Sequence, residues 1–440
     1  MEFVVLIIFI LGYIAITLEH NLKIDKLVPA LAMMALAWAV VSLSHLPVFE
    51  VSPHGLEESN VEAVLLHHFG KTCEILIFLI GAMTIVEIID HFDGFATIKK
   101  FIKTNQKKTL LWIVAILAFI LSAIIDNLTA TIVLISILAK LIKKREDRIW
   151  YVGLIVVTAN AGGAWSPIGD VTTTMLWMGE KVTTLKLIEH LILPSLVCML
   201  IPTYLASKMK AFQGTFDAPK ENEVVNKHSA FMLYLGLALI VAVPVFKTLT
   251  HLPPYVGMML SLAIFTIFAE LITNREFEMS DATSDTGHVS PVHSALAKIE
   301  MPSLLFFLGI LMTVAALESL GMIFQFGQSV EGSIGTDLFI IILGFASAVV
   351  DNVPLVAAGM GMFPDLVIDH PDWHLIAFTA GTGGSMLIIG SAAGVVAMGM
   401  ERIDFFWYLK KIAWLALVGY ISGVAAFYFF NHYLFNALSV

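Results

Sequence analysis

Two Asp-Asn pairs in apolar stretches are the residues of this 440-residue chain best suited to chemistry. The first pair, Asp126-Asn127, ends the sequence SAIIDN, and the second, Asp351-Asn352, ends SAVVDN. An ionised carboxylate inside a bilayer costs about 2.5–3.5 kcal/mol on insertion scales, so it needs a compensating partner. Carboxylate and amide oxygens, with the backbone carbonyls that a hairpin tip leaves free, are hard ligands that suit an alkali cation. Helix N-capping is the alternative, but the duplication of the pair favours cation and proton binding.

A third carboxylate in an apolar block, Asp170, ends the sequence NAGGAWSPIGD, which starts at Asn160. Its glycines and proline oppose a continuous helix, so we expect a broken helix at 149–178. Irregular backbone at membrane depth is tolerated where it lines a cavity or is buried in protein. The second half repeats the break at 374–400, with neutral residues only. The candidate ligands from the two breaks are Asn160, Ser166, Asp170, Thr172, Thr173, Thr382, Ser385 and Ser391.

Some of the candidate polar residues have two interpretations. Glu87, Asp90 and His91 share one helical face near the end of a crossing, and Glu318 has a comparable place in the second half. These four residues either form interfacial contacts and salt bridges or give protons access to the site. The threonines that follow Asp170 likewise either bind the ion or satisfy backbone carbonyls.

The composition defines the class of protein. Hydrophobic residues make up 58% of the chain and charged residues 14%, against about 25% charged in soluble domains. We expect an all-α integral membrane protein with about ten transmembrane helices, and membrane lipid as its partner. The predicted crossings are 3–18, 27–46, 73–92, 149–178, 187–206, 229–248, 253–272, 302–324, 374–400 and 405–434. No phosphate loop, nucleophile elbow or metal-ligand pair is present, so we expect no enzyme, no cofactor and no nucleic-acid partner.

Two further blocks, 109–142 and 337–365, are predicted to enter and leave the membrane on one side. The first has Lys or Arg on both flanks, which the positive-inside rule assigns to the cytoplasm. Its arms of about 16 residues reach about 24 Å, short of the ~30 Å hydrocarbon core, so a re-entrant hairpin is favoured over two tilted spans. The second has acidic flanks, and no Lys or Arg lies between 301 and 401, so we expect it to open to the outside.

The two hairpins belong to two repeats of predicted opposite orientation. SAIIDN returns in similar form after 225 residues, and TANAGG at 158–163 returns after 221 residues as TAGTGG. The predicted repeats are 1–206 and 229–440, joined by a cytoplasmic linker at 207–228. Each holds five crossings and one hairpin, and because five is odd, the second repeat enters the membrane from the other side. Secondary transporters carry substrate sites at the interface of such repeats. We expect the protein to lie in a bacterial-type plasma (inner) membrane.

Three motifs carry a resemblance to a known family: DNLTAT from Asp126, WSPIGDVTT from Trp165 and DNVP from Asp351. Over essentially its whole length the chain resembles the NhaD-type sodium/proton antiporters of the ion transporter superfamily, which is related to divalent anion/sodium symporters and arsenite-pump membrane subunits. The resemblance implies a homodimer, a scaffold with a mobile subdomain that moves like an elevator, and activity favoured at alkaline pH. The hairpin tips of the anion carriers usually read Ser-Asn-Thr. Here Asp replaces Ser, which favours cations and protons over a carboxylate substrate.

The predicted function is exchange of Na+ or Li+ for protons by alternating access. The cation and the protons would compete for the carboxylates, and we expect Na+ at Asp126, Asn127, Asp170, Asp351 and Asn352. The alternative is a Na+-coupled carrier of a small anion, a dicarboxylate or an oxyanion, which would need a cationic pocket. No Lys or Arg lies inside a predicted crossing near the hairpin tips. A gated channel is a third class, which the inverted halves disfavour.

Overall fold

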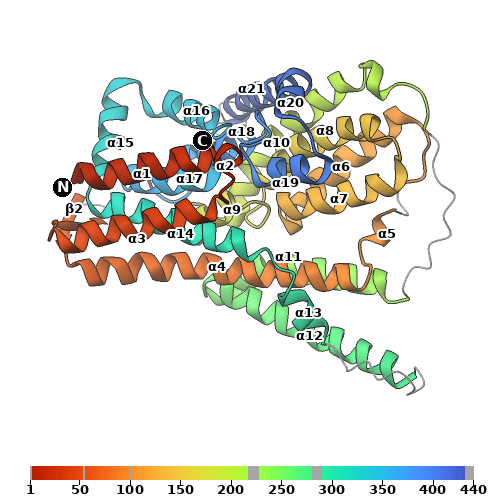
Figure 1. The fold of residues 1–440 in the computed structure, drawn as a ribbon, viewed down its shortest axis with the longest axis horizontal. Helices are drawn as coiled ribbons and strands as arrows, with labels where there is room; N and C mark the ends of the chain where they lie inside the picture. The colour runs from red at the N-terminus through yellow and green to blue at the C-terminus, as the bar shows by residue number, and fades with distance from the viewer. Residues whose placement is uncertain (1, 53–54, 100–101, 217–226, 280–289, 432–440) are drawn as a thin grey trace, which may run out of the picture.

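The computed structural model describes residues 2–52, 55–99, 102–216, 227–279 and 290–431, and these residues are mostly helical (Figure 1). The helices in chain order are α1 (Glu2–Thr17), α2 (Glu19–Leu22), α3 (Leu27–Leu43), α4 (Val61–His91), α5 (Ala96–Lys99), α6 (Lys107–Ile125), α7 (Asn127–Leu141), α8 (Arg145–Gly163), α9 (Val171–Met178), α10 (Thr184–Ala206), the 3-10 helix η1 (Lys210–Phe212), α11 (Ser229–Thr250), α12 (Pro254–Met279), α13 (Pro291–Leu296), α14 (Met301–Ser319), α15 (Met322–Ser333), α16 (Thr336–Ala346), α17 (Asn352–Met362), α18 (Pro371–Gly383), α19 (Ala392–Glu401), α20 (Phe405–Lys411) and α21 (Ala413–Phe430).

Seven helices of the described residues are long and apolar enough to cross a membrane: α4, α6, α10, α11, α12, α14 and α21. α15 and α16 are joined by a bend of 119° and make an eighth candidate if they form one span. The prediction of a helical, multi-pass membrane protein is therefore confirmed. α1 and α3 coincide with two predicted crossings but have 16 and 17 residues, fewer than the roughly 20 of a typical span. The count of ten crossings stays a prediction.

The prediction of an all-α chain misses one small sheet. β1 (Val48–Ser52) pairs antiparallel with β2 (Gly55–Ser59) between α3 and α4, with Val48 opposite Ser59. The alternating sequence VFEVS, with Val48 buried, is typical of a short strand. α4 also begins at Val61 rather than near residue 73, because the Asn60 side chain caps it by accepting the Ala63 N–H at 2.8 Å.

The helices pack as two groups. The first group is formed by α1, α3, α4, α11, α12, α13 and α14, and the second by α6 to α10 and α15 to α21. Figure 1 shows the long helices of the first group, in red to green, lying along one side of the molecule. The groups touch mainly where α14 packs on α15 and α17, α11 on α6 and α4 on α9. α6, α7, α8 and α9, which surround Asp126 and Asp170, are thus held together within one group.

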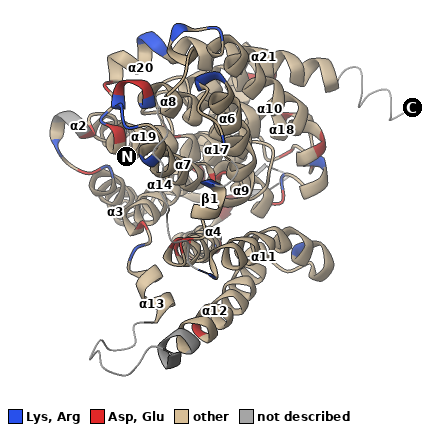
Figure 2. Cartoon of the chain, turned by 90° about the vertical axis from the view of Figure 1, so that its right-hand side faces the viewer, with Lys and Arg blue, Asp and Glu red and all other residues tan. Residues whose placement is uncertain are grey.

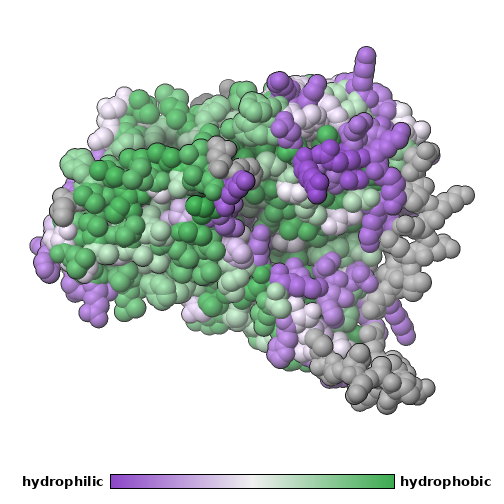
Figure 3. Space-filling model, viewed as in Figure 1, coloured by the Kyte–Doolittle hydropathy of each residue, from purple (hydrophilic) through white to green (hydrophobic). Residues whose placement is uncertain are grey.

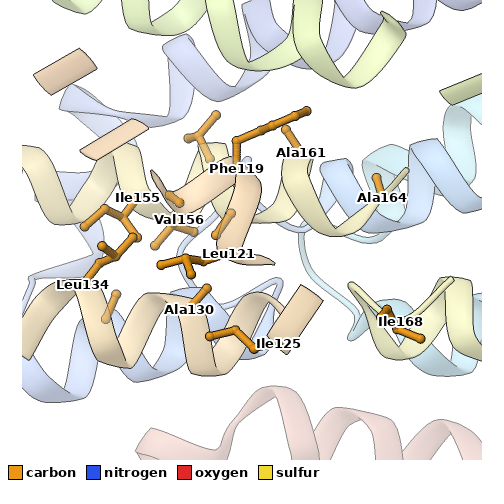
Figure 4. Close-up of a cluster of buried hydrophobic side chains, with 14 of the residues drawn as sticks. Phe119, Leu121, Ile125, Ala130, Leu134, Ile155, Val156, Ala161, Ala164 and Ile168 are labelled. Carbon is orange, nitrogen blue, oxygen red and sulfur yellow. The ribbon is translucent and has the colours of Figure 1, made fainter. Parts of the chain in front are cut away.

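The two repeated sequences form the same local contacts. The Ser122 hydroxyl donates to the Ala159 carbonyl at 2.6 Å, and the Ser347 hydroxyl donates to the Ala380 carbonyl at 2.7 Å. These bonds tie each hairpin to the interrupted helical segment of its own half. The first hairpin is also held by a buried apolar core, in which Figure 4 shows Leu134 of α7 and Ile155 of α8 facing each other.

Many of the basic residues lie at one end of the molecule. Lys and Arg lie at the start of α6 and α8 and at the end of α20, and Figure 2 views this end. Figure 3 shows a largely apolar surface over the middle of one face, with many hydrophilic side chains at the same end and fewer at the opposite edge. Here Arg148 forms two bonds to Glu401, Nε to Oε1 at 2.6 Å and Nη2 to Oε2 at 2.9 Å, with Glu401 only 4% exposed. This ion pair joins α8 of the first half to α19 of the second.

The predicted linker at 207–228 is described only at its two ends, because 217–226 lies outside the described residues. Its first part packs beside the start of the first hairpin. The Phe216 N–H donates to the Asn105 carbonyl at 2.9 Å, and the Lys107 N–H donates to the Gly214 carbonyl at 3.0 Å.

Candidate ion-binding site

The first hairpin turns at one residue. α6 ends at Ile125 and α7 begins at Asn127, so only Asp126 separates the two helices. Asp126 has φ +73° and ψ 160°, a region that favours glycine and costs other residues about 1–3 kcal/mol. Its carboxylate caps α7 by accepting the Thr129 N–H and hydroxyl, each at 2.8 Å. Capping and ion binding are compatible, because each carboxylate oxygen has a second lone pair.

The two helices of the predicted second hairpin have a longer connection. α16 ends at Ala346, and α17 begins at Asn352. Asp351 caps α17 through Oδ1, which accepts the Val353 N–H at 3.3 Å. Oδ2 of Asp351 instead faces Lys26 of the first group, with Nζ 3.6 Å away. The two Asp residues thus share a capping function but differ in their other partners.

The interrupted segments place Asp170 and Ser391 in equivalent positions. The chain is helical to Gly163 and again from Val171, and in the second half to Gly383 and again from Ala392. Asp170 and Ser391 are the extended residues directly before α9 and α19. Close approach of the helix ends requires glycine, since a Cβ at position 163 would lie 2.5 Å from the Gly169 carbonyl oxygen, and one at 384 would lie 2.6 Å from that of Gly390.

Asp170 is the point where the two halves meet around a carboxylate. The residue is 3% exposed, and its Oδ2 accepts the Thr172 hydroxyl at 3.0 Å and the Asn352 amide at 3.1 Å. Gly381 of the second half leaves space here, because a Cβ at this position would lie 3.3 Å from the same oxygen. Asp170 also lies within electrostatic range of Asp126 and Asp351. A carboxylate with so little exposure and only neutral hydrogen-bond donors retains an uncompensated charge.

The equivalent position on the other side of the site is neutral. The Asn127 amide donates to Asn160 Oδ1 at 3.0 Å, and the Asn160 amide donates to the Ser391 hydroxyl at 3.0 Å. All three residues are buried. Asn160 and Gly381 are therefore equivalent residues of the two halves. Asn160 lies beside Ser391, and Gly381 lies beside Asp170.

The remaining predicted ligands bond to nearby backbone. The Thr173 hydroxyl donates to the Asp170 carbonyl at 2.9 Å, and the Thr382 hydroxyl donates to the Phe378 carbonyl at 2.6 Å. Ser385 donates to the Thr382 carbonyl at 2.6 Å, and Ser166 accepts the Ile168 N–H at 3.4 Å. For Thr173 the bond is the backbone alternative that the sequence left open, whereas Thr172 reaches the carboxylate. The hydroxyl oxygens retain lone pairs that can still face an ion.

The carboxylates border two cavities of different size. One of about 20 Å³ is lined by Asp126 and Asp170, together with Thr174 and apolar side chains such as Phe78 and Met258. This volume is close to the minimum that holds one water-sized particle. A cavity of about 400 Å³ reaches Asp351 and is also lined by Tyr13, Glu19 and Lys26.

Lys26 is the site residue that sequence reasoning missed. It directly precedes a predicted crossing, where a basic residue is normally an interfacial flank, and nothing in its neighbouring sequence distinguishes it from Lys23. The fold brings it to the second hairpin tip. No basic residue lies inside a predicted crossing near the tips, but this sequence observation did not show that a basic residue outside the crossings reaches Asp351.

The four predicted proton-access residues lie away from these contacts. Asp90 and His91 are exposed near the end of α4, and Glu87 is half-buried within electrostatic range of Lys298. Glu318 lines a separate cavity of about 240 Å³ that also contains Lys181. None of the four shares a hydrogen bond or ion pair with Asp126, Asp170 or Asp351 in the part of the chain that the structure describes.

A buried carboxylate and two partly buried ones, placed at helix ends and interrupted helical segments of a multi-pass protein, are typical of secondary transporters. The comparisons with known proteins agree. The profile of the citrate transporter family (CitMHS) matches residues 4–383. The chain therefore belongs to this family of the ion transporter superfamily, and the predicted resemblance to NhaD-type antiporters is confirmed by relatives of that name.

Two relatives and one solved structure show the extent of the similarity. Sodium/proton antiporter 1 of Arabidopsis thaliana is 42% identical over 96% of this chain and 71% of its own length. Na(+)/H(+) antiporter NhaD of Alkalimonas amylolytica is 32% identical over 99% of this chain and 92% of its own. The crystal structure of the YdaH transporter of Alcanivorax borkumensis superposes with a TM-score of 0.58 at 11% identity, over 92% of this chain and 97% of that one, which supports the fold. Because the family and these relatives are transporters, the prediction that the chain is not an enzyme is confirmed.

Proposed function

We propose that this protein is a secondary active antiporter that exchanges Na+ or Li+ for protons at Asp126, Asp170 and Asp351. The observation that carries the proposal is the environment of Asp170. Its buried carboxylate accepts a hydrogen bond from the Asn352 amide of the other half, and Asp170 lines a small cavity together with Asp126. The antiporter names of the relatives from Arabidopsis thaliana and Alkalimonas amylolytica point to the same activity.

Competition for the carboxylates explains exchange. Ionised groups with little exposure are costly, so a cation that leaves the site must be replaced by protons on the same oxygens. Asn127, Asn352, Asn160, Thr172 and Ser391 supply neutral oxygens beside the charged ones. No resident cofactor takes part, and the ions are the substrate.

The transport cycle is proposed to use the two groups of helices. The first group would act as a scaffold and the second as an elevator that carries the carboxylates across the membrane, in a homodimer. The two hairpins would be re-entrant and the halves inverted, with the basic end of α6, α8 and α20 in the cytoplasm of a bacterial-type inner membrane. The matching Ser122 and Ser347 bonds and the sparse contacts between the groups support this arrangement.

The alternative, a Na+-coupled anion carrier, has one observation in its favour. The family description names citrate, and Lys26 supplies a cation in the 400 Å³ cavity. Lys26 faces Asp351, however, and its charge is thereby already offset. Antiport is therefore the better-supported function.

The test is ion flux in proteoliposomes that contain the purified full-length protein. Addition of Na+ to the outside should drive protons out of vesicles, and candidate dicarboxylates should not alter this flux. Asp126→Asn, Asp170→Asn and Asp351→Asn should each abolish it, whereas the exposed Asp365→Asn should keep it. Retained flux in the three variants would remove the assigned site, and flux that requires an anion would select the alternative.

A further inference from the structure

A basic residue, Lys26, lies beside Asp351 at the predicted tip of the second hairpin. Nζ of Lys26 is 3.6 Å from Oδ2 of Asp351, and the two side chains are 21% and 15% exposed. The distance exceeds the 2.7–3.2 Å or so of a nitrogen-to-oxygen hydrogen bond. The ammonium thus offsets the negative charge without a direct hydrogen bond, so another cation can displace it at small cost.

The surroundings of Lys26 are those of a cation site. Its ammonium lies over the ring of Phe306, 4.4 Å from the ring centre, and an aromatic face attracts cations. Tyr13 lines the same cavity, and its hydroxyl oxygen is buried without a hydrogen-bond partner among the described residues. Glu19 adds a second carboxylate to the cavity wall. Lys26, Asp351, Glu19 and Tyr13 therefore all line one space of about 400 Å³.

The ion pair connects the two groups of helices. Lys26 directly precedes α3 of the first group, and Asp351 belongs to the hairpin tip of the second. Any movement of one group against the other changes this distance. Among the described residues, no basic side chain lines the cavity beside Asp126, and the residues of the first group in its wall are apolar, among them Phe78, Leu79 and Met258.

We propose that Lys26 is a built-in competitor of the transported cation: its ammonium offsets Asp351 in this conformation and must be displaced before Na+ binds there. This inference rests on the proposed function, because it names the competitor at one of the proposed ion ligands. Lys26 is thus a positioning residue that ties an empty Asp351 to the first group of helices and releases it when the site is loaded.

Na+ binding to the purified full-length protein in detergent tests this proposal, by calorimetric titration at one fixed alkaline pH. Lys26→Gln removes the competitor and should bind Na+ more tightly than the wild type, by about 5-fold or more. Lys26→Arg keeps the charge and should stay near the wild type. The matched control is Lys23→Gln, which removes an exposed charge from the same loop and should change nothing.

The conservative variant gives a second readout that a structural effect on the loop would not move. Lys26→Arg restores a cation beside Asp351, so it should reverse the tighter Na+ binding of Lys26→Gln. Phe306→Leu weakens the support of the ammonium and should tighten Na+ binding by a smaller factor, which keeps the test open if Lys26→Gln does not fold.

The outcomes separate the two proposals. Equal or weaker Na+ binding by Lys26→Gln and Phe306→Leu, with normal binding by the wild type, would overturn the function of Lys26 alone. A wild type that binds no Na+ would instead refute the proposed antiport.

Discussion

The tips of the two hairpins have nearly the same sequence but lie in different surroundings. Asp126 borders a cavity of about 20 Å³ whose walls from the first group of helices are apolar. Asp351 borders one of about 400 Å³ and faces Lys26. Both residues cap the helix that follows them. The two Asp residues thus share their capping function, and the neighbouring helices leave Asp126 beside a small cavity and Asp351 beside a large one with a basic residue.

A second difference lies between the interrupted segments. Asp170 faces Gly381, whereas its counterpart Ser391 faces Asn160. The carboxylate of Asp170 thus lies opposite a glycine without a side chain, whereas the hydroxyl of Ser391 lies opposite an asparagine side chain. The asymmetry concentrates negative charge on the side of Asp170, and substitutions can exchange the two arrangements.

The largest effect is expected when the second half is made like the first. Gly381→Asn places a side chain where a Cβ alone would lie 3.3 Å from Oδ2 of Asp170, so the carboxylate must move and lose the Asn352 amide. Na+-dependent proton flux should fall roughly 100-fold, the upper part of the range for coupling free energies of about 1–3 kcal/mol. Gly399→Asn is the control, because nothing lies within 4 Å of its Cβ position. Unchanged flux in Gly381→Asn would mean that Asp170 does not need this space.

A smaller effect should distinguish the two tip asparagines. Asn352 donates to a carboxylate and Asn127 to a neutral amide. Hydrogen bonds to charged groups contribute about 1.5–3 kcal/mol and neutral ones about 0.5–1.5 kcal/mol. Asn352→Ala should therefore weaken Na+ binding by more than Asn127→Ala, measured as the two dissociation constants at the same pH. The reverse order would show that the neutral side of the site holds the cation.

The smallest effect should be equal in the two halves. Ser122→Ala and Ser347→Ala each remove one buried bond to a carbonyl, of 2.6 and 2.7 Å. Each should lower the free energy of unfolding by about 1 kcal/mol, measured by reversible denaturation in detergent. Ser329→Ala on an exposed helical face should change it by less than about 0.5 kcal/mol. Clearly unequal values for Ser122 and Ser347 would break the equivalence of the two hairpins.

Much of the site could be predicted because its signals are local. The carboxylates at 126, 170 and 351 stand out since apolar sequence surrounds them, and the breaks before Asp170 and Ser391 follow from clustered glycines and a proline. The limits of α4 and the β1–β2 pair were missed because a capping Asn60 and five alternating residues are weak signals beside long apolar blocks. Thr173 could not be separated from Thr172, because the choice between a backbone carbonyl and the Asp170 carboxylate depends on the local turn.

The sequence by itself determined which residues are costly to bury and where helices must stop, since both follow from the chemistry of neighbouring residues. It thereby determined the class of protein and pointed to most of the candidate ligands. Only the tertiary structure decided which ligands meet. Asn352 reaches Asp170 across 182 residues, Asn160 reaches Ser391 across 231, and Lys26 reaches Asp351 from another group of helices. Such contacts depend on how whole helices pack, and no local pattern encodes that.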